Sequence, residues 1–148
     1  MKLFCEGLDL SDAVLKVIKA ASNKTTNPIL EGIKLIAEDD TLTLIATDGE
    51  LAIEKKIKAN VEIEGQTVVP GRLFSEFVKK LSNEQIELTL NSNNQLKLKY
   101  TDSEVYMQCL NVSEFPVIQQ ISNAQFFTMK QGDFKDLVEK TIFCVALD

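Results

Sequence analysis

Residues that could carry acid–base or metal chemistry are few in this sequence. It contains no histidine, which removes the commonest general base and the commonest metal ligand. The three cysteines, Cys5, Cys109 and Cys144, lie far apart in apolar segments and form no Cys-x-x-Cys pair, so we expect buried, reduced thiols. Glycine motifs of nucleotide-binding folds and the G-x-S-x-G motif of hydrolases do not occur. The sequence therefore predicts a protein that is no enzyme and has no cofactor or metal.

Four carboxylates, Asp39, Asp40, Asp48 and Glu50, fall close to two expected hairpin turns. Carboxylates grouped in this way could hold a metal ion or act as an acid–base pair. Aspartate is also frequent in turns, because its side chain accepts hydrogen bonds from nearby backbone N–H groups. We interpret these four residues as solvated turn residues.

Basic residues are concentrated on two expected helices. Lys16 and Lys19 project from the polar side of the first helix, and Arg72 and Lys79, two turns apart, share a face of the second. The net charge of −6 is unfavourable for general binding to phosphates. Many acids, however, belong to expected strands and turns, so basic helices beside acidic sheets would let one face contact phosphates. An ordinary solvated helix surface is the alternative interpretation.

Hydrophobic periodicity defines the elements that must position these residues. Apolar residues at helical spacing predict helices over residues 10–22, with Asp9 and Asp12 at the N-terminus, and over 71–81, after Pro70. Alternation of apolar and polar residues predicts strands, and Asp48-Gly49 predicts a two-residue type I′ hairpin turn. The expected strands are residues 1–5, 29–37, 41–47, 50–59, 66–69, 86–90, 95–100 and 103–110.

These elements predict an α+β domain, residues 1–117, built from two pseudo-symmetric β-α-β-β-β halves. The halves cover residues 1–61 and 62–115, and their two helices should lie adjacent and antiparallel on one side of antiparallel sheets. The strand 103–110 should form a sheet edge with unpaired backbone groups. Such a domain is long enough to bury one core.

The first strand and helix recur near the end of the chain. A shift of 124 positions places Leu3 on Phe127 and makes Asp12 and Lys16 identical to Asp136 and Lys140. We therefore expect residues 118–148 to be a linker and the first strand and helix of a second domain, whose sheet lies in a natural chain continuing past residue 148. Without that sheet, the apolar side of this helix should be mobile or packed on another molecule. No apolar run is long enough to cross a bilayer and no segment is typical of a signal peptide, so we expect a cytoplasmic location.

The chain resembles the bacterial DNA sliding clamps, the β subunits of DNA polymerase III. The likeness rests on short motifs that follow one another in order along the whole chain. They are MKL at the N-terminus, P-I-L at 28–30, T-L-x-L…T-D at 41–48, V-P-x-R at 69–72, E-F-P at 114–116 and F-T-x-x-x-x-x-F-x-x-L-V at 127–138.

This resemblance implies a DNA-clamp fold and a processivity factor for replication. In that family, subunits form a head-to-tail homodimeric ring that encloses double-stranded DNA, with helices lining the hole and sheets forming the rim. The ring tethers the replicative polymerase and is opened by a clamp loader; it has no catalytic activity of its own.

The resemblance also assigns site residues. By motif, DNA contacts carry over to Lys24, Arg72 and Lys79, while helical geometry adds Lys16 and Lys19. Asp12 shares the face of Lys16, which should weaken the positive field there. The strand 103–110 corresponds to the edge that closes the ring, with the dimer contacts assigned to Val105, Met107, Gln108 and Leu73.

Without the resemblance, the same features describe a different kind of protein. An unpaired edge strand is a template for sheet extension, so the chain could be a non-enzymatic α+β module that binds a protein partner through this edge. A clamp requires basic residues concentrated on the exposed side of its helices, whereas such a module does not.

Overall fold

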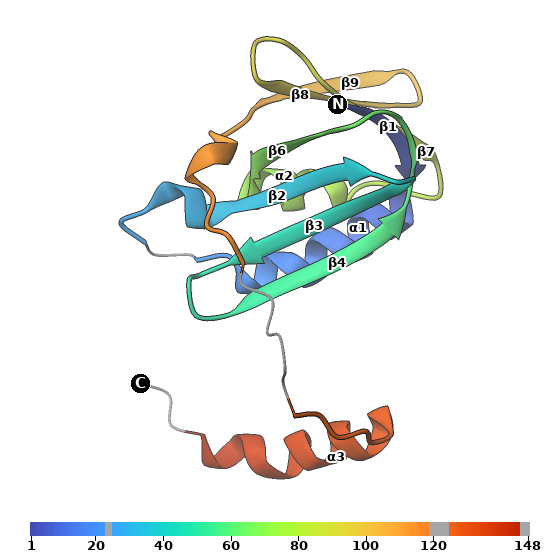
Figure 1. The fold of residues 1–148 in the computed structure, drawn as a ribbon. Helices are drawn as coiled ribbons and strands as arrows, with labels where there is room; N and C mark the ends of the chain where they lie inside the picture. Colours follow the sequence, from blue (N-terminus) through green and yellow to red (C-terminus); the bar gives the residue numbers. More distant parts are fainter. Residues whose placement is uncertain (23–24, 119–124, 146–148) are drawn as a thin grey trace. The chain divides into compact units, whose positions relative to one another are not determined.

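The computed structural model describes residues 1–22, 25–118 and 125–145 (Figure 1). The chain divides into two compact units, Met1–Ile118 (unit 1) and Gln119–Asp148 (unit 2). Unit 1 contains two α-helices, α1 (Gly7–Val17) and α2 (Gly71–Val78). Its strands are β1 (Lys2–Glu6), β2 (Gly32–Glu38), β3 (Thr41–Thr47), β4 (Ala52–Lys58), β5 (Asn60–Ile63), β6 (Gly65–Pro70), β7 (Gln85–Leu90), β8 (Gln95–Tyr100) and β9 (Ser103–Gln108).

The strands form two antiparallel sheets that join the halves of unit 1. One sheet has the order β5-β1-β7-β8-β9 and the other the order β4-β3-β2-β6. β1 of the first half thus pairs with β7, and β6 of the second half pairs with β2. Each half therefore gives its first strand to the sheet that holds the other half's later strands. The expected α+β class, antiparallel sheets and repeated element order are confirmed.

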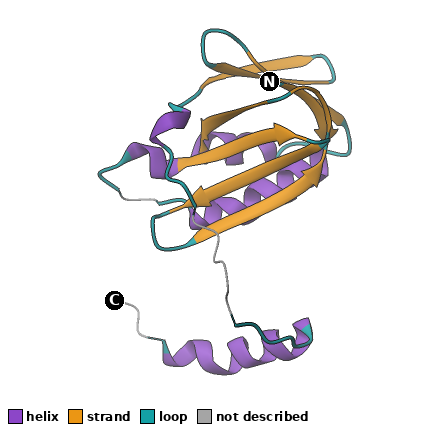
Figure 2. Cartoon of the chain, viewed as in Figure 1, coloured by secondary structure: helices purple, strands orange, loops and turns teal. Residues whose placement is uncertain are grey.

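The two helices run antiparallel against the β4-β3-β2-β6 sheet (Figures 1 and 2). Gly7 begins α1 against the chain just after α2: a Cβ there would lie 2.6 Å from the carbonyl oxygen of Ser82. Gly71 begins α2 beside the end of α1, where a Cβ would lie 2.7 Å from Cδ1 of Ile18. Each helix therefore starts with the one residue type that permits this close approach.

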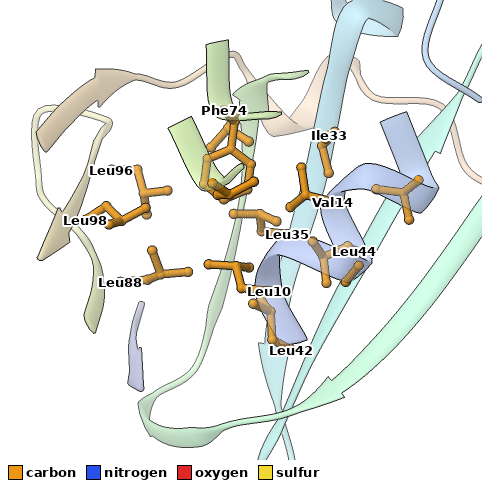
Figure 3. Packing of buried hydrophobic residues seen from close by; sticks show 14 of the residues in the cluster. Leu10, Val14, Ile33, Leu35, Leu42, Leu44, Phe74, Leu88, Leu96 and Leu98 are labelled. Carbon is orange, nitrogen blue, oxygen red and sulfur yellow. The ribbon is translucent and has the colours of Figure 1, made fainter. Parts of the chain in front are cut away.

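A single core contains residues of both sheets and both helices. Figure 3 shows Leu10 and Val14 of α1 and Phe74 of α2 among side chains of both sheets. The apolar stripe expected for α1 is buried, since Leu10, Ala13, Val14 and Val17 are fully inaccessible to solvent. A smaller cluster of Ile29, Ile45, Val68 and Phe115 lies apart from this core. It explains why β3 is buried on both of its faces.

Several predicted boundaries are wrong. Residues Pro28–Glu31 form a 3₁₀ turn (η2), so β2 begins at Gly32 and not at 29. α1 begins at Gly7, before Asp9 and Asp12, and no side chain caps it; the backbone N–H of Gly7 donates to the carbonyl of Glu84 at 2.8 Å. The helices also end earlier than expected, α1 continuing as the 3₁₀ turn η1 (Ile18–Ala20).

The two hairpins of the first half differ from expectation in their turns. Asp39 and Asp40 have φ values of 46° and 53°, the positive pair that a type I′ turn requires. Asp48-Gly49 is not such a turn, because β3 ends at Thr47 and β4 begins only at Ala52. Leu51, which falls within the expected strand 50–59, consequently lies in the turn and is 52% exposed.

Strand β5 was not expected from the sequence. Its residues Asn60, Glu62 and Ile63 are exposed and Val61 is only half-buried. An edge strand with so little buried surface does not need the apolar alternation by which strands are predicted. A further 3₁₀ turn, η3 (Val112–Glu114), follows β9.

Within residues 125–145, unit 2 contains one α-helix, α3 (Gln131–Thr141), followed by the 3₁₀ turn η4 (Ile142–Cys144). Both lie 124 positions after α1 and η1, so the helical part of the sequence repeat is also a repeat of structure. The strand expected before this helix does not form, since residues 125–130, which include the counterpart of β1, contain no strand. Along the apolar stripe, Phe134 is 56% exposed, Leu137 52% and Val138 40%. Among residues 125–145, no sheet covers this stripe.

Candidate nucleic-acid interface

A groove on the helix side of unit 1 brings together two of the predicted cations. It has a volume of about 530 Å³ and lies between the end of α1 and the exposed side of α2. Arg72 and Lys79 line it from α2, as their two-turn spacing predicts. Glu31 and Glu76 also line it, so the groove carries charges of both signs.

Arg72 projects almost entirely into solvent. Its side chain is 93% exposed, and its Nε lies 3.3 Å from Oε1 of Glu76, one turn later on the same helix. Its guanidinium can donate hydrogen bonds to the oxygens of a phosphate, as its Nε does to this carboxylate. Glu76 was not singled out in the sequence, although its i,i+4 spacing from Arg72 could have indicated the pair.

Lys16 lies on α1 and is not part of the groove. Its Nζ is 2.7 Å from Oδ2 of Asp12, and this hydrogen bond, together with the positive charge of nearby Lys55 on β4, lowers the pKa of Asp12. The weakening of the field by Asp12 that the sequence suggests therefore has a direct structural basis. Lys55 is an additional cation beside α1 that sequence reasoning missed.

Of the other two predicted DNA contacts, Lys19 lies within the described residues and Lys24 does not. Lys19, in η1, is exposed, and the structure gives it no ion pair within the described residues. Lys24 lies outside the described residues, so its predicted role stays a prediction. Of the five predicted cations, the structure gathers Arg72 and Lys79, while Lys16 and Lys19 are exposed elsewhere on the helix layer.

Strand β9 forms one edge of its sheet, as predicted. The predicted interface residues on it differ in exposure: Val105 is half-buried and Gln108 is exposed, but Met107 is only 3% exposed and belongs to the core. Met107 can therefore offer a partner strand its backbone, not the apolar side chain that was expected. Leu73, on α2, is 53% exposed.

Glu104 and Tyr106, two exposed residues of β9, were not among the predicted contacts. Tyr106 is 55% exposed, and its hydroxyl donates to a carboxylate oxygen of Glu104 at 2.9 Å. This bond raises the pKa of Tyr106 and lowers that of Glu104, which also faces Lys97. The position of Tyr106, an aromatic residue on the polar face of a predicted edge strand, could have indicated a contact residue. Gln108 donates through Nε2 to the carbonyl of Asn94 at 3.0 Å, within its own hairpin.

The cysteines and the turn carboxylates, which were weighed as catalytic or metal-binding groups, can now be placed in the structure. Burial raises the pKa of the Cys5 thiol to about 12, and Cys109 is also buried with a raised pKa. Cys144 is exposed, so the expectation of a third buried thiol is wrong. The Asp48 carboxylate accepts from the backbone N–H groups of Leu51 and Glu50, which lowers its pKa and fixes the turn.

Across the described ranges, no group of three or more metal-binding side chains comes together. Within the same part of the chain, no helix is both long enough and apolar enough to span a membrane.

Comparisons with known proteins give one consistent result. Residues 1–119 match the family model for the N-terminal domain of the DNA polymerase III beta subunit. The beta sliding clamp of Halalkalibacterium halodurans is 32% identical over 138 residues, covering 88% of this chain, and that of Bacillus subtilis is 30% identical over 154 residues, covering 99%. A crystal structure of the DNA polymerase sliding clamp from Bacillus subtilis covers all of this chain with a TM-score of 0.94 at 29% identity.

The matches extend over only part of these relatives. The chain spans 36% of the length of the Halalkalibacterium halodurans clamp and 41% of the Bacillus subtilis clamp. It likewise covers 41% of the Bacillus subtilis clamp structure.

Proposed function

Because this chain belongs to the DNA polymerase III beta subunit family, the bacterial sliding clamps, we propose that it acts as part of a clamp that holds replication machinery on double-stranded DNA. The match of residues 1–119 to the N-terminal domain model carries this proposal. The protein has no catalytic step of its own and works in the cytoplasm. Its partners are duplex DNA, the replicative polymerase, a clamp loader and a second subunit of the ring.

In this proposal the helix layer of unit 1 faces the DNA. Arg72 and Lys79 in the groove, with Lys16 and Lys19 on α1 and η1, contact phosphates. Such contacts read no sequence, because phosphates are the same at every base pair, and a sliding protein must not hold base edges. Lys24 joins this set from the resemblance alone.

The β9 edge is proposed as the ring-closing surface. Its backbone pairs with an edge strand of the partner subunit, and Val105, Gln108 and Leu73 border the contact. Exposed Tyr106 adds an aromatic side chain on the same strand. We also propose that residues 118–148 are the linker and first strand–helix of a second clamp domain, which accounts for the structural repeat of α1 by α3.

The test of the DNA-facing side uses charge reversal with a matched control. The 148-residue chain is titrated with a fluorescent duplex at about 0.01 M salt, where the Debye length of about 30 Å leaves phosphate attraction largely unscreened. The test variant carries Lys16→Glu and Arg72→Glu. The control carries Lys58→Glu and Lys99→Glu, two exposed lysines of the strands, and has the same net charge.

We expect the helix variant to lose binding and the strand variant to keep most of it. In the wild-type chain, the logarithm of affinity should fall with the logarithm of salt by about 0.9 per phosphate contact. Circular dichroism checks that both variants fold, as exposed positions should allow. Equal loss in both variants would contradict a DNA-facing helix layer, and no binding by any variant would contradict DNA contact by this chain.

A further inference from the structure

Each described α-helix carries an exposed cation bound to an acid one turn away on the same helix. The pairs differ in order, since the acid comes first on α1 and second on α2 and α3. Their separations are 2.7, 3.3 and 3.5 Å for Asp12–Lys16, Arg72–Glu76 and Lys135–Glu139, respectively.

The charges of the Arg72–Glu76 pair on α2 oppose the dipole of that helix. A helix N-terminus is partly positive and is stabilised by acids, and the C-terminal end is stabilised by cations. α2 instead has Arg72 in its first turn, no acid there, and Glu76 toward its end. The order acid before base also favours helices more than the reverse order. Helix stability therefore does not account for this placement of Arg72 and Glu76.

The pairing acid lies at the charged end of the cation, where a phosphate would also bind. Glu76 holds Nε of Arg72 at 3.3 Å, and Asp12 holds Nζ of Lys16 while also lying near Lys55. A phosphate that contacts either cation must displace the carboxylate or approach it closely. Two negative charges at one cation repel each other, so the acid opposes the contact in both cases.

We propose that Asp12 and Glu76 are built-in competitors of DNA phosphates that limit the hold of the helix layer on the duplex. The proposal rests on the proposed function, because it assumes that this layer faces DNA. A weak hold suits a protein that must move along the duplex while the ring prevents its escape. Lys19 and Lys79 have no ion pair in the described ranges, so they provide contacts without this competition.

The experiment removes the competitors without touching the cations. The double variant Asp12→Asn and Glu76→Gln raises the net charge by two and keeps the shapes of both side chains. Its control, Glu38→Gln and Glu50→Gln, makes the same change of charge at exposed positions beside the hairpin turns. Both are titrated with the fluorescent duplex between about 0.01 and 0.1 M salt, where the Debye length falls from about 30 to 10 Å.

We expect the competitor variant to bind the duplex about two- to fivefold more tightly per acid removed, the range for exposed ion pairs. The control should gain less, because its acids touch no helix cation. The affinity of the competitor variant should also depend more steeply on salt. An equal gain in the two variants, or no gain in either, would overturn the proposal.

Charge reversal at Lys16 and Arg72 separates this result from a failure of the proposed function. If reversal weakens binding and removal of the acids does nothing beyond the control, the helix layer faces DNA and the competitor proposal is wrong. If neither change affects binding, both the competitor proposal and the DNA-facing helix layer are wrong.

Discussion

The chain contains one helical module twice, in two different settings. α1 and α3 are both 11 residues long, and each ends in a 3₁₀ turn. Leu10 of α1 is fully buried, whereas Phe134, its equivalent in α3, is 56% exposed. Unit 1 provides a four-stranded sheet and a second helix against α1. Residues 125–145 of unit 2 provide neither for α3.

This difference separates what forms a helix from what buries it. Both helices have an aspartate in the first turn, Asp9 or Asp133, and a lysine in the last, Lys16 or Lys140. These charges favour both ends through the helix dipole and are encoded locally. Burial depends on residues far away in sequence, because the strands that cover α1 come after it. A helix of this length is marginal without such packing.

Hydrogen exchange should show the largest contrast between the two helices. The buried amides of α1 should exchange only when unit 1 unfolds as a whole, with an opening free energy of about 5 kcal/mol or more. The amides of α3 should have an opening free energy close to zero. Exchange of the 148-residue chain, followed by NMR, measures both values in one sample. Equal protection of α1 and α3 in dilute solution would contradict the comparison.

Truncation of equivalent residues should give the next largest effect. Leu10→Ala leaves a cavity in the core and should lower the free energy of unfolding by about 3 kcal/mol. Phe134→Ala removes a half-exposed ring and should change it by no more than about 0.5 kcal/mol. Urea unfolding measures both variants. Similar losses would mean that the α3 stripe is buried in solution.

Replacing a glycine by alanine should destabilise the fold at α1 but stabilise the helix at α3. Gly7→Ala places a Cβ 2.6 Å from the Ser82 carbonyl oxygen, and the backbone shift that this forces should cost about 1–3 kcal/mol. Gly132, in α3, has open space around it, so Gly132→Ala should favour the helix by up to about 1 kcal/mol. Urea unfolding measures the first change and helical circular dichroism the second. Loss of helix in the second variant would be the contrary result.

The smallest effect concerns the Asp12–Lys16 ion pair. The hydrogen bond from Lys16 places the pKa of Asp12 in the folded state below its unfolded value. Its contribution to stability is therefore complete above the unfolded pKa of about 3.9 and is lost as pH falls through the folded pKa. Asp12→Asn should slightly weaken unit 1 at neutral pH and reduce its loss of stability below about pH 4. Asp136→Asn, outside unit 1, is the control and should leave the unfolding of unit 1 unchanged.

Much of the fold was predictable because its pattern is local. Apolar spacing predicted both helices of unit 1, and alternation predicted all of its strands except β5. The wrong boundaries lie where contacts with residues distant in sequence determine the local structure. A loop carbonyl, that of Glu84, starts α1 without a side-chain cap, and a second apolar cluster holds Pro28–Glu31 in a turn. The close approach of the two halves requires Gly7 and Gly71, and this requirement cannot be seen in the spacing of apolar residues in the sequence.

The candidate site was less predictable because exposed side chains follow no periodic rule. The shared face of Arg72 and Lys79 could be deduced from their spacing on one helix. The positions of Lys16 and Lys19 outside the groove could not, because they depend on how α1 packs beside α2. Burial of Met107 likewise depends on which face of β9 meets the core.

The most direct test of the central claim, that the helix layer of unit 1 is its DNA side, is an NMR titration. The ¹⁵N-labelled chain is titrated with a short duplex at about 0.01 M salt, and amide shifts are followed for every described element. We expect shift changes on the exposed side of α1, η1 and α2, around Lys16, Lys19, Arg72 and Lys79, with little change on β8 and β9. Changes confined to β8 and β9, with the helices unaffected, would contradict the claim.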